Sequence, residues 1–245
     1  VRQAGIPPHR NHGAFLVPPR TFQDRHMPHF PDIETFQQLA TDHHLVPVYR
    51  CLLCDSLTPV SAFQRLDDGG SACLFESVIG GEKVGRYSFL AAKPYAELSA
   101  HSNRVTLKTS EGTSEFDSAD PLEEIRKQIN ALKAAHLPQL PPFEGGAIGY
   151  AGYDVVRYTE HLPNAPQDDR QLPDLCFGFY DEMIVFDNVT KTMFVIVMAR
   201  IDDSAADLEA AYEVAKDRVD RVVAKLAGPA DGLTCADIDA TGAPE

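Results

Sequence analysis

Apolar and polar positions near the start of the folded part predict a short helix followed by a strand. The segment 33–40, IETFQQLA, repeats apolar residues at helical spacing, and Asp32 stands before it as the expected N-cap. The next apolar run, LVPVYRCLL at 45–53, is rich in β-branched and aromatic residues, which is typical of a strand.

A second short helix is predicted in LTPVSAFQRL. Thr58 is the expected N-cap, and Pro59 occupies the first helical position, where its missing N–H is harmless. We expect three residues of this helix to face inward: Val60, Phe63 and Leu66.

Two further segments predict longer helices. In DPLEEIRKQINALKAAHLP, Asp120 caps the helix and Pro121 follows it, and acidic residues fill the first turn. One buried stripe is expected to comprise Leu122, Ile125, Ile129 and Leu132. The second helix is predicted to run from a Ser204 cap to Gly228.

Strand patterns are more numerous than helix patterns and mostly follow one another directly. The expected strands are SACLFESV, then AELSAH and RVTLKT around a turn at Ser102 and Asn103, and finally FGFYDEMIVFD and TMFVIVMAR as a hairpin across NVTK. Because strands join directly rather than through helices, the predicted class is α+β with mainly antiparallel sheets and flanking helices.

Composition limits the classes of partner. The chain has 245 residues and a formal net charge of −14, from 36 acidic and 22 basic residues. This charge disfavours nucleic acid and anionic membrane surfaces. No apolar run approaches the ~20 residues of a membrane-spanning helix. The proline-rich residues 1–30 are interpreted as a flexible leader, and 31–228 as one domain.

Cysteine and histidine patterns give no metal or redox site. An odd count of five cysteines favours a reducing, cytoplasmic setting. Cys51 and Cys54 form a lone C-x-x-C without a second ligand pair, and two H-x-x-H pairs in the leader lack thiol or acidic partners. We therefore expect no metal and no catalytic residue in this chain.

Two glycine-rich segments were considered as phosphate or dinucleotide sites. Gly80 and Gly85 have the spacing of a phosphate-binding loop, but Arg86 and Tyr87 replace its lysine and hydroxyl residue. FEGGAIGYAGYDVVR is interpreted as a strand of small residues that lets another sheet or helix approach closely. We expect Asp154 and Arg157, after it, to be a surface or docking pair.

The segment LFESVIGGEKVGRYSFL, 74–90, is the strongest candidate for a binding site. Glu76 and Ser77 end an apolar run, and a glycine turn returns the chain to Arg86. An acid, a hydroxyl and a guanidinium in one place suit a small zwitterion, because each pairs with one of its charged groups. A hairpin with a charged tip is the alternative.

Four motifs in order resemble one family. LTPVSAF, LFESVIGGEKVGRYSFL, PFEGGAIGYAGYDVVRYTEHLP and LPDLCFGFYDEMIVFD together resemble the N-terminal domain of anthranilate synthase component I, the large subunit. The resemblance implies a carbon–oxygen lyase of tryptophan biosynthesis that makes anthranilate from chorismate, with ammonia from a glutamine amidotransferase subunit. It also implies an antiparallel sheet fold and allosteric inhibition by L-tryptophan.

By this resemblance, the tryptophan site comprises Glu76, Ser77, Arg86, Tyr87 and Ser88, with Phe89 against the indole. Phe75 departs from the family's LLES motif, which has leucine there. The family's chorismate site, with Mg²⁺ and the catalytic groups, lies in a C-terminal domain whose motifs we do not find. Residues 229–245 are expected to begin a linker to it, so this fragment alone is predicted to be inactive.

Two alternatives stay open at this stage. Aminodeoxychorismate synthase component I is a close relative with a similar N-terminal domain. A free-standing amino-acid-binding module without catalysis is also compatible with the composition.

The first prediction concerns Ser77. Ser77→Phe fills the expected effector site and removes a hydrogen-bonding group, so L-tryptophan affinity should fall strongly, by about tenfold or more. Calorimetric titration measures this affinity, and an unchanged value would remove Ser77 from the site.

Overall fold

A computed structural model describes residues 28–76, 85–164, 167–201 and 207–228. These form two five-stranded sheets in which every pair of neighbouring strands is antiparallel. Sheet A has the order β1 (Leu45–Leu53), β10 (Thr192–Arg200), β9 (Glu182–Asp187), β3 (Tyr87–Ala92) and β2 (Ala72–Phe75). Sheet B has the order β6 (Gly112–Asp117), β5 (Arg104–Thr109), β4 (Ala96–His101), β8 (Leu175–Tyr180) and β7 (Gly146–Ala151).

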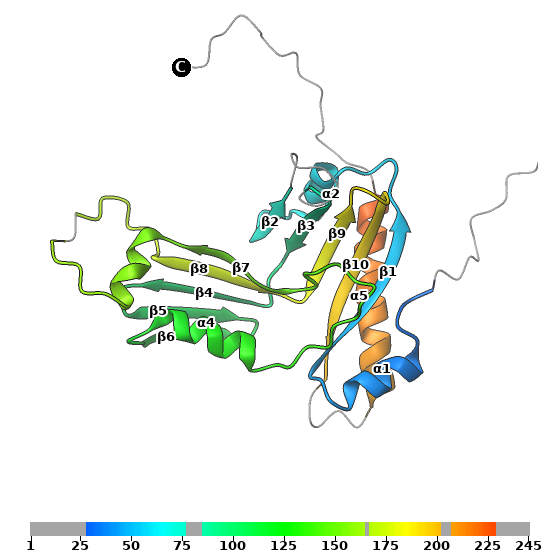
Figure 1. The fold of residues 1–245 in the computed structure, drawn as a ribbon, viewed down its shortest axis with the longest axis horizontal. Coiled ribbons are helices and arrows are strands. Elements are labelled where there is room, and N and C mark those ends of the chain that lie inside the picture. Colours follow the sequence, from blue (N-terminus) through cyan, green and yellow to red (C-terminus); the bar gives the residue numbers. More distant parts are fainter. Residues whose placement is uncertain (1–27, 77–84, 165–166, 202–206, 229–245) are drawn as a thin grey trace, which may run out of the picture.

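The helices flank these sheets, which confirms the predicted α+β class. One face of sheet A is covered by α1 (Ile33–Ala40), α2 (Pro59–Leu66) and α5 (Leu208–Ala227), which share one apolar core with it. The helix α4 (Pro121–Asn130) packs on sheet B, and a 3₁₀ helix η1 (Tyr153–Tyr158) follows β7. Figure 1 shows α5 running along sheet A, with sheet B extending away from it.

Local sequence signals fix the helix starts. Asp32 accepts a hydrogen bond from the Thr35 amide at 2.8 Å, as an N-cap does. Thr58 and Ser61 bond to each other's backbone amides, which closes a capping box at the start of α2. The predicted caps of α1, α2 and α4 and the bounds of β1 are confirmed.

Four details of the helix predictions were wrong. The helix α4 ends at Asn130, so Leu132 of the expected stripe lies beyond it. Val60 and Ile129 are exposed, because these short helices bury a narrower stripe than the spacing predicts. α5 begins at Leu208, where Asp207 accepts from the Ala210 amide at 2.9 Å, rather than at a Ser204 cap. Ser204 itself lies outside the described residues.

The predicted strand FGFYDEMIVFD is two strands in different sheets. β8 ends at Tyr180 and β9 begins at Glu182, so the chain passes from sheet B to sheet A at Asp181. Arg218 of α5 donates to both Asp181 carboxylate oxygens, at 3.1 and 2.8 Å, and to Glu182 Oε1 at 2.8 Å. This ion pair fixes the crossing between the sheets. The hairpin of β9 and β10 is as predicted.

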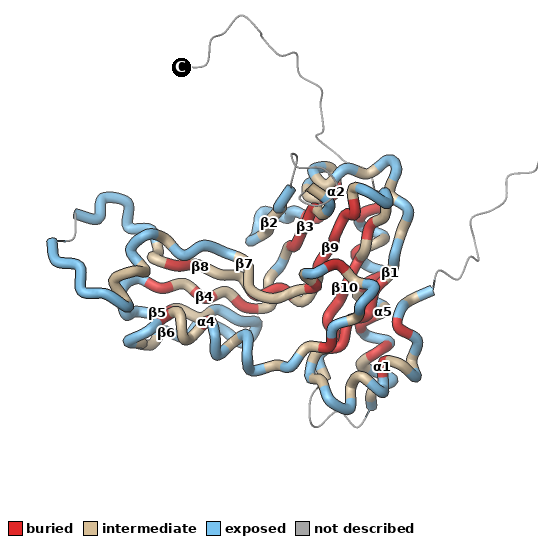
Figure 2. The backbone as a smooth tube through the Cα atoms, viewed as in Figure 1, coloured by how far each residue is buried: buried red, intermediate tan, exposed pale blue. Residues whose placement is uncertain are grey.

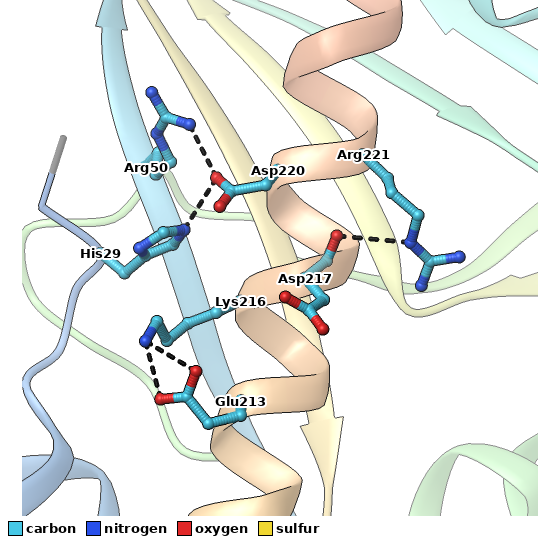
Figure 3. A network of polar contacts seen from close by, with 7 residues as sticks. All are labelled: His29, Arg50, Glu213, Lys216, Asp217, Asp220 and Arg221. Carbon is cyan, nitrogen blue, oxygen red and sulfur yellow. Dashed lines mark hydrogen bonds and ion pairs between the residues drawn. The ribbon is translucent and has the colours of Figure 1, made fainter. Parts of the chain in front are cut away.

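The end of the predicted leader packs against the body. Phe30 exchanges backbone hydrogen bonds with Tyr49, at 2.9 and 2.7 Å. His29 and Arg50 both contact Asp220 of α5, at 2.9 and 2.7 Å, as Figure 3 shows. Residues 1–27 and 229–245 lie outside the described residues, and the domain bounds stay a prediction.

Strand β7 lies closer to β8 of its own sheet than a side chain allows, whereas the small-residue interpretation expected the close approach of another sheet or helix. A Cβ atom on Gly149 would lie 2.0 Å from the Cys176 carbonyl oxygen and 2.6 Å from Phe177 Cα. Because both obstacles are backbone atoms, only a displacement of the strand would relieve the clash.

We therefore expect Gly149→Ala to lower the free energy of unfolding by about 3 kcal/mol. Chemical denaturation measures this value. The matched control is Gly70→Ala, whose new methyl group meets only the movable Asp68 side chain, at 3.3 Å. Equal effects of the two substitutions would contradict the close approach.

Candidate functional site

The two faces of sheet A have different surroundings. Along β3, Ser88 and Leu90 face the helices, whereas Tyr87 and Phe89 lie on the opposite face. Along β9, Ile184 and Phe186 share the helical core, while Met183 and Val185 belong to the cluster on the other side. We call this second side, which faces away from α5, the open face.

Strand register places the aromatic side chains of the open face in rows across the sheet. One row consists of the directly opposed residues Cys51, Phe194, Val185, Phe89 and Phe75. Phe89 and Phe194 are half-buried, and Phe75 at the sheet edge is 53% exposed. These rings leave an apolar surface uncovered within the described residues.

Cover on the open face decreases toward the end of the strands where Asp187 lies. The neighbouring row, Tyr49, Ile196, Met183 and Ala91, is buried. Its cover includes residues 131–144, which link α4 to β7 and which we call the strap. Figure 1 shows the strap passing across sheet A, and Figure 2 shows the buried central strands beside it. Phe143 of the strap packs edge-on against Phe89, with ring centroids 6.0 Å apart.

An arginine–aspartate pair closes one side of the open face. Arg86 Nε and Nη2 donate to Asp187 Oδ2 at 3.0 and 2.7 Å, and the guanidinium carbon lies 4.9 Å from the centre of the Tyr87 ring. Burial raises the pKa of Asp187, but the hydrogen bonds from Arg86 and from the Thr190 and Val189 amides outweigh burial and lower the pKa overall.

The structure brings only some of the five predicted effector residues together. Arg86 and Tyr87 lie together at the open face, and exposed Glu76 directly follows Phe75 at the sheet edge. Ser77 lies outside the described residues. Ser88 faces the helices instead, is fully buried, and accepts a hydrogen bond from Asn188 Nδ2 at 3.2 Å. The period-two alternation of a strand explains why neighbours Tyr87 and Ser88 separate.

Sequence reasoning missed Phe194 and Asp187 as residues of this face. Asp187 is 101 positions from Arg86, and both missed residues reach the face through pairing with distant strands. No local motif marks them. A polar residue ending the apolar run MIVF was the only available signal for Asp187.

Glu144 is a buried carboxyl group at the end of the strap. It is 6% exposed, and its Oε2 atom has no hydrogen-bond partner among the described residues. His136, which is exposed, lies 3.6 Å from the other oxygen. Burial raises the pKa of Glu144 above its ordinary 4.5, against the opposing charge and hydrogen bond of His136.

Other candidate sites have less support. Cys51 lies on the open face, but Cys54 packs toward the helical core and bonds to Leu57, so the two thiols do not converge. Within the described ranges, no three metal-ligating side chains cluster. Nor does the described part contain a helix long and apolar enough to cross a membrane.

A hollow of about 640 Å³ lies at the far end of sheet B, around η1 and the β4–β5 turn. Two pairs of its polar side chains bond to each other. Arg157 donates to Asp154 at 2.7 Å, which confirms a surface pair, and Tyr158 donates to Asp174 at 2.9 Å. Burial, followed by this hydrogen bond, raises the pKa of Tyr158. These four side chains are therefore already paired within the hollow.

The fold and the open face define an α+β domain with an aromatic surface and a charged edge. The chain belongs to the chorismate binding enzyme family, which matches residues 70–231. The resemblance to anthranilate synthase component I is confirmed. The family match runs through sheets A and B themselves, and the expected absence of a chorismate site from this chain stays a prediction.

Several relatives carry the same name. The chain is 35% identical over 190 residues to anthranilate synthase component 1 of Acetivibrio thermocellus and 40% identical over 201 residues to that of Acinetobacter calcoaceticus. These alignments cover 78% and 79% of this chain, but only 38% and 39% of the relatives' lengths. The chloroplastic anthranilate synthase alpha subunit 1 of Arabidopsis thaliana is 38% identical over 213 residues, or 80% of this chain and 35% of the relative.

Among solved structures, anthranilate synthase component I from Streptococcus pneumoniae TIGR4 is similar, with a TM-score of 0.49 and 28% identity. The alignment covers 74% of this chain and 37% of that one.

The raised pKa of Glu144 gives a prediction about stability. Below the pKa that Glu144 has in the unfolded chain, the group is protonated in both the folded and the unfolded state, and it does not lower the free energy of unfolding. As the pH rises through the folded pKa, the buried group must ionise and stability is lost. Glu144→Gln removes this loss. The melting temperature of the variant, relative to that of the wild type, should therefore increase as the pH rises from about 4.5 to neutrality.

Thermal unfolding across this pH range measures the difference. The matched control is Glu111→Gln, at an exposed residue of the β5–β6 turn, which should follow the wild-type curve. Parallel curves for Glu144→Gln and wild type would show that burial does not govern the ionisation of Glu144.

Proposed function

We propose that this chain is the tryptophan-binding, regulatory part of the large subunit of an anthranilate synthase. The observation that carries the proposal is the identity of 35–40% over most of the chain to proteins named anthranilate synthase component 1. In this proposal the complete subunit converts chorismate and ammonia to anthranilate and pyruvate, and L-tryptophan bound to this domain inhibits it.

The open face supports an aromatic amino acid as the ligand. Phe75, Phe89 and Phe194 offer rings for stacking against an indole, and such contacts contribute about 0.5–1.5 kcal/mol beyond area burial. The carboxylate of Glu76 suits the ligand's ammonium group, and the Arg86 guanidinium suits its carboxylate. Ser77, next to Glu76 in the chain, remains part of the proposed site.

Among the described residues, the proposed site is one wall rather than an enclosed pocket. Because the chain spans less than two fifths of the curated relatives above, we propose that the opposite wall, the Mg²⁺ site and the catalytic groups belong to a further domain. The fragment alone then has no synthase activity. A glutamine amidotransferase subunit is the proposed ammonia source, and the cytoplasm the proposed location.

The identity of the relatives favours this proposal over the alternatives. The three curated relatives above are named for anthranilate synthase, which favours it over aminodeoxychorismate synthase component I. A free-standing amino-acid-binding module would bind the same ligand without a catalytic partner. Synthase activity of the complete subunit, inhibited by tryptophan, separates these possibilities.

Calorimetric titration of L-tryptophan into the 245-residue protein tests the proposal, with L-phenylalanine and chorismate as controls. We expect saturable heat with tryptophan, a weaker response to phenylalanine and none with chorismate. Binding of chorismate without binding of tryptophan would contradict the regulatory assignment. If none of the three compounds binds, this chain alone does not contain a working tryptophan site.

Phe89→Leu tests the aromatic wall while keeping an apolar side chain of similar volume. Loss of ring stacking should weaken L-tryptophan binding about tenfold, as measured by the same titration. Phe116→Leu in β6 of sheet B is the matched control and should leave the affinity unchanged. If both variants bind like the wild type, the ligand does not lie on the open face.

A further inference from the structure

Like the His136–Glu144 pair, the Arg86–Asp187 pair joins a buried acid to a more exposed base. Asp187 is 4% exposed, while Arg86 is 43% exposed. In the Arg104–Glu115 pair on sheet B, by comparison, both side chains are more than half exposed. An ion pair with a buried acid and an exposed base presents its positive group to whatever lies outside.

Four hydrogen bonds hold the Asp187 carboxylate in one orientation. Its Oδ2 atom accepts twice from Arg86, at 3.0 and 2.7 Å, and its Oδ1 atom accepts from the Val189 and Thr190 amides at 3.0 and 3.2 Å. Four donors around one buried carboxylate stabilise its ionised form. The carboxylate therefore stays a fixed negative charge at the end of β9.

The backbone around Arg86 is also held. Asn188 donates its backbone amide to the Arg86 carbonyl oxygen at 2.8 Å, and its side chain donates to the Gly85 carbonyl oxygen at 3.3 Å. Tyr87, which lies directly opposite Asp187 in the register, places its ring 4.9 Å from the guanidinium carbon. The guanidinium is thus fixed at one end by an acid and along one side by a ring.

This arrangement prepares the guanidinium for an anion. A guanidinium has more N–H donors than one carboxylate oxygen accepts, so donors remain beyond those that bind Asp187. A planar group already held in place loses less conformational entropy when it binds a carboxylate. The Phe89 ring, 6.1 Å from the Tyr87 ring, continues the same surface.

We propose that Asp187 is a positioning residue, which orients Arg86 to bind the α-carboxylate of the amino-acid ligand on the open face. The proposal rests on the function proposed above and adds a specificity element. The site should distinguish an amino acid from its amide, because only the former brings a carboxylate to Arg86.

The test compares L-tryptophan with L-tryptophanamide, which keeps the indole and the amine but lacks the carboxylate. Both are titrated into the wild type and into Asp187→Asn. Asparagine has nearly the same size as aspartate. Its side-chain oxygen can still accept hydrogen bonds from the Val189 and Thr190 amides, so the turn after β9 keeps these bonds. We expect about a tenfold loss of affinity for tryptophan and no loss for the amide.

A second variant covers the case in which Asp187→Asn does not fold, as melting temperature will show. Arg86→Lys keeps the positive charge but loses the planar fork that Asp187 orients, and it should show the same ligand-dependent loss. Glu115→Gln, which breaks the exposed Arg104 pair on sheet B, is the control and should change neither affinity.

The outcomes separate this inference from the function on which it rests. If the wild type binds neither ligand, the proposed function and this inference both fall. If the wild type binds tryptophan and the Asp187 and Arg86 variants weaken both ligands equally or neither, only the positioning role is overturned. A loss confined to the ligand with a carboxylate supports it.

Discussion

Strands β9 and β10 carry apolar side chains on both faces, so sheet A needs cover on both sides. Met183, Ile184 and Val185 are consecutive residues of β9, and all are buried. Such a strand cannot form the edge or the bare surface of a sheet without exposing a large apolar area. The helices cover most of one face, and the strap covers part of the other. The rest of the architecture follows from this requirement.

The candidate site is the part of the open face that the described residues do not cover. Near Tyr49, the strap and the start of sheet B bury the open face. Toward Asp187 the cover ends, and the aromatic row containing Phe89 and Phe194 becomes accessible. The charged groups stand at the edge of this surface, where their desolvation costs less than in the core. A ligand with an apolar body and two opposite charges matches that distribution.

Much of the local structure could be predicted from the sequence, and much of the long-range structure could not. Asp32 and Thr58 cap helices because each interacts with residues only three positions away. The change of sheet at Asp181 has no such local signal, since the apolar runs on both sides of it read as one strand. Its determinant, Arg218, lies on a distant helix. Strand β6 was also missed, because it is polar along nearly its whole length.

In the candidate site, too, the local features could be predicted from the sequence and the long-range ones could not. The motif around Glu76 and Arg86 lies at one end of the open face of sheet A, but strand alternation places Ser88 on the other face. Asp187 and Phe194 reach the site only through the antiparallel register of β3, β9 and β10. Pairing partners of this kind become visible when the strand order is known.

The central claim is that the open face of sheet A binds an aromatic amino acid, and a crystal structure of the protein with L-tryptophan tests it most directly. Electron density for the indole is expected against Phe89 and Phe194, with the carboxylate within hydrogen-bond distance of Arg86. Density for the ligand at the far end of sheet B, or on the helical side of sheet A, would contradict it.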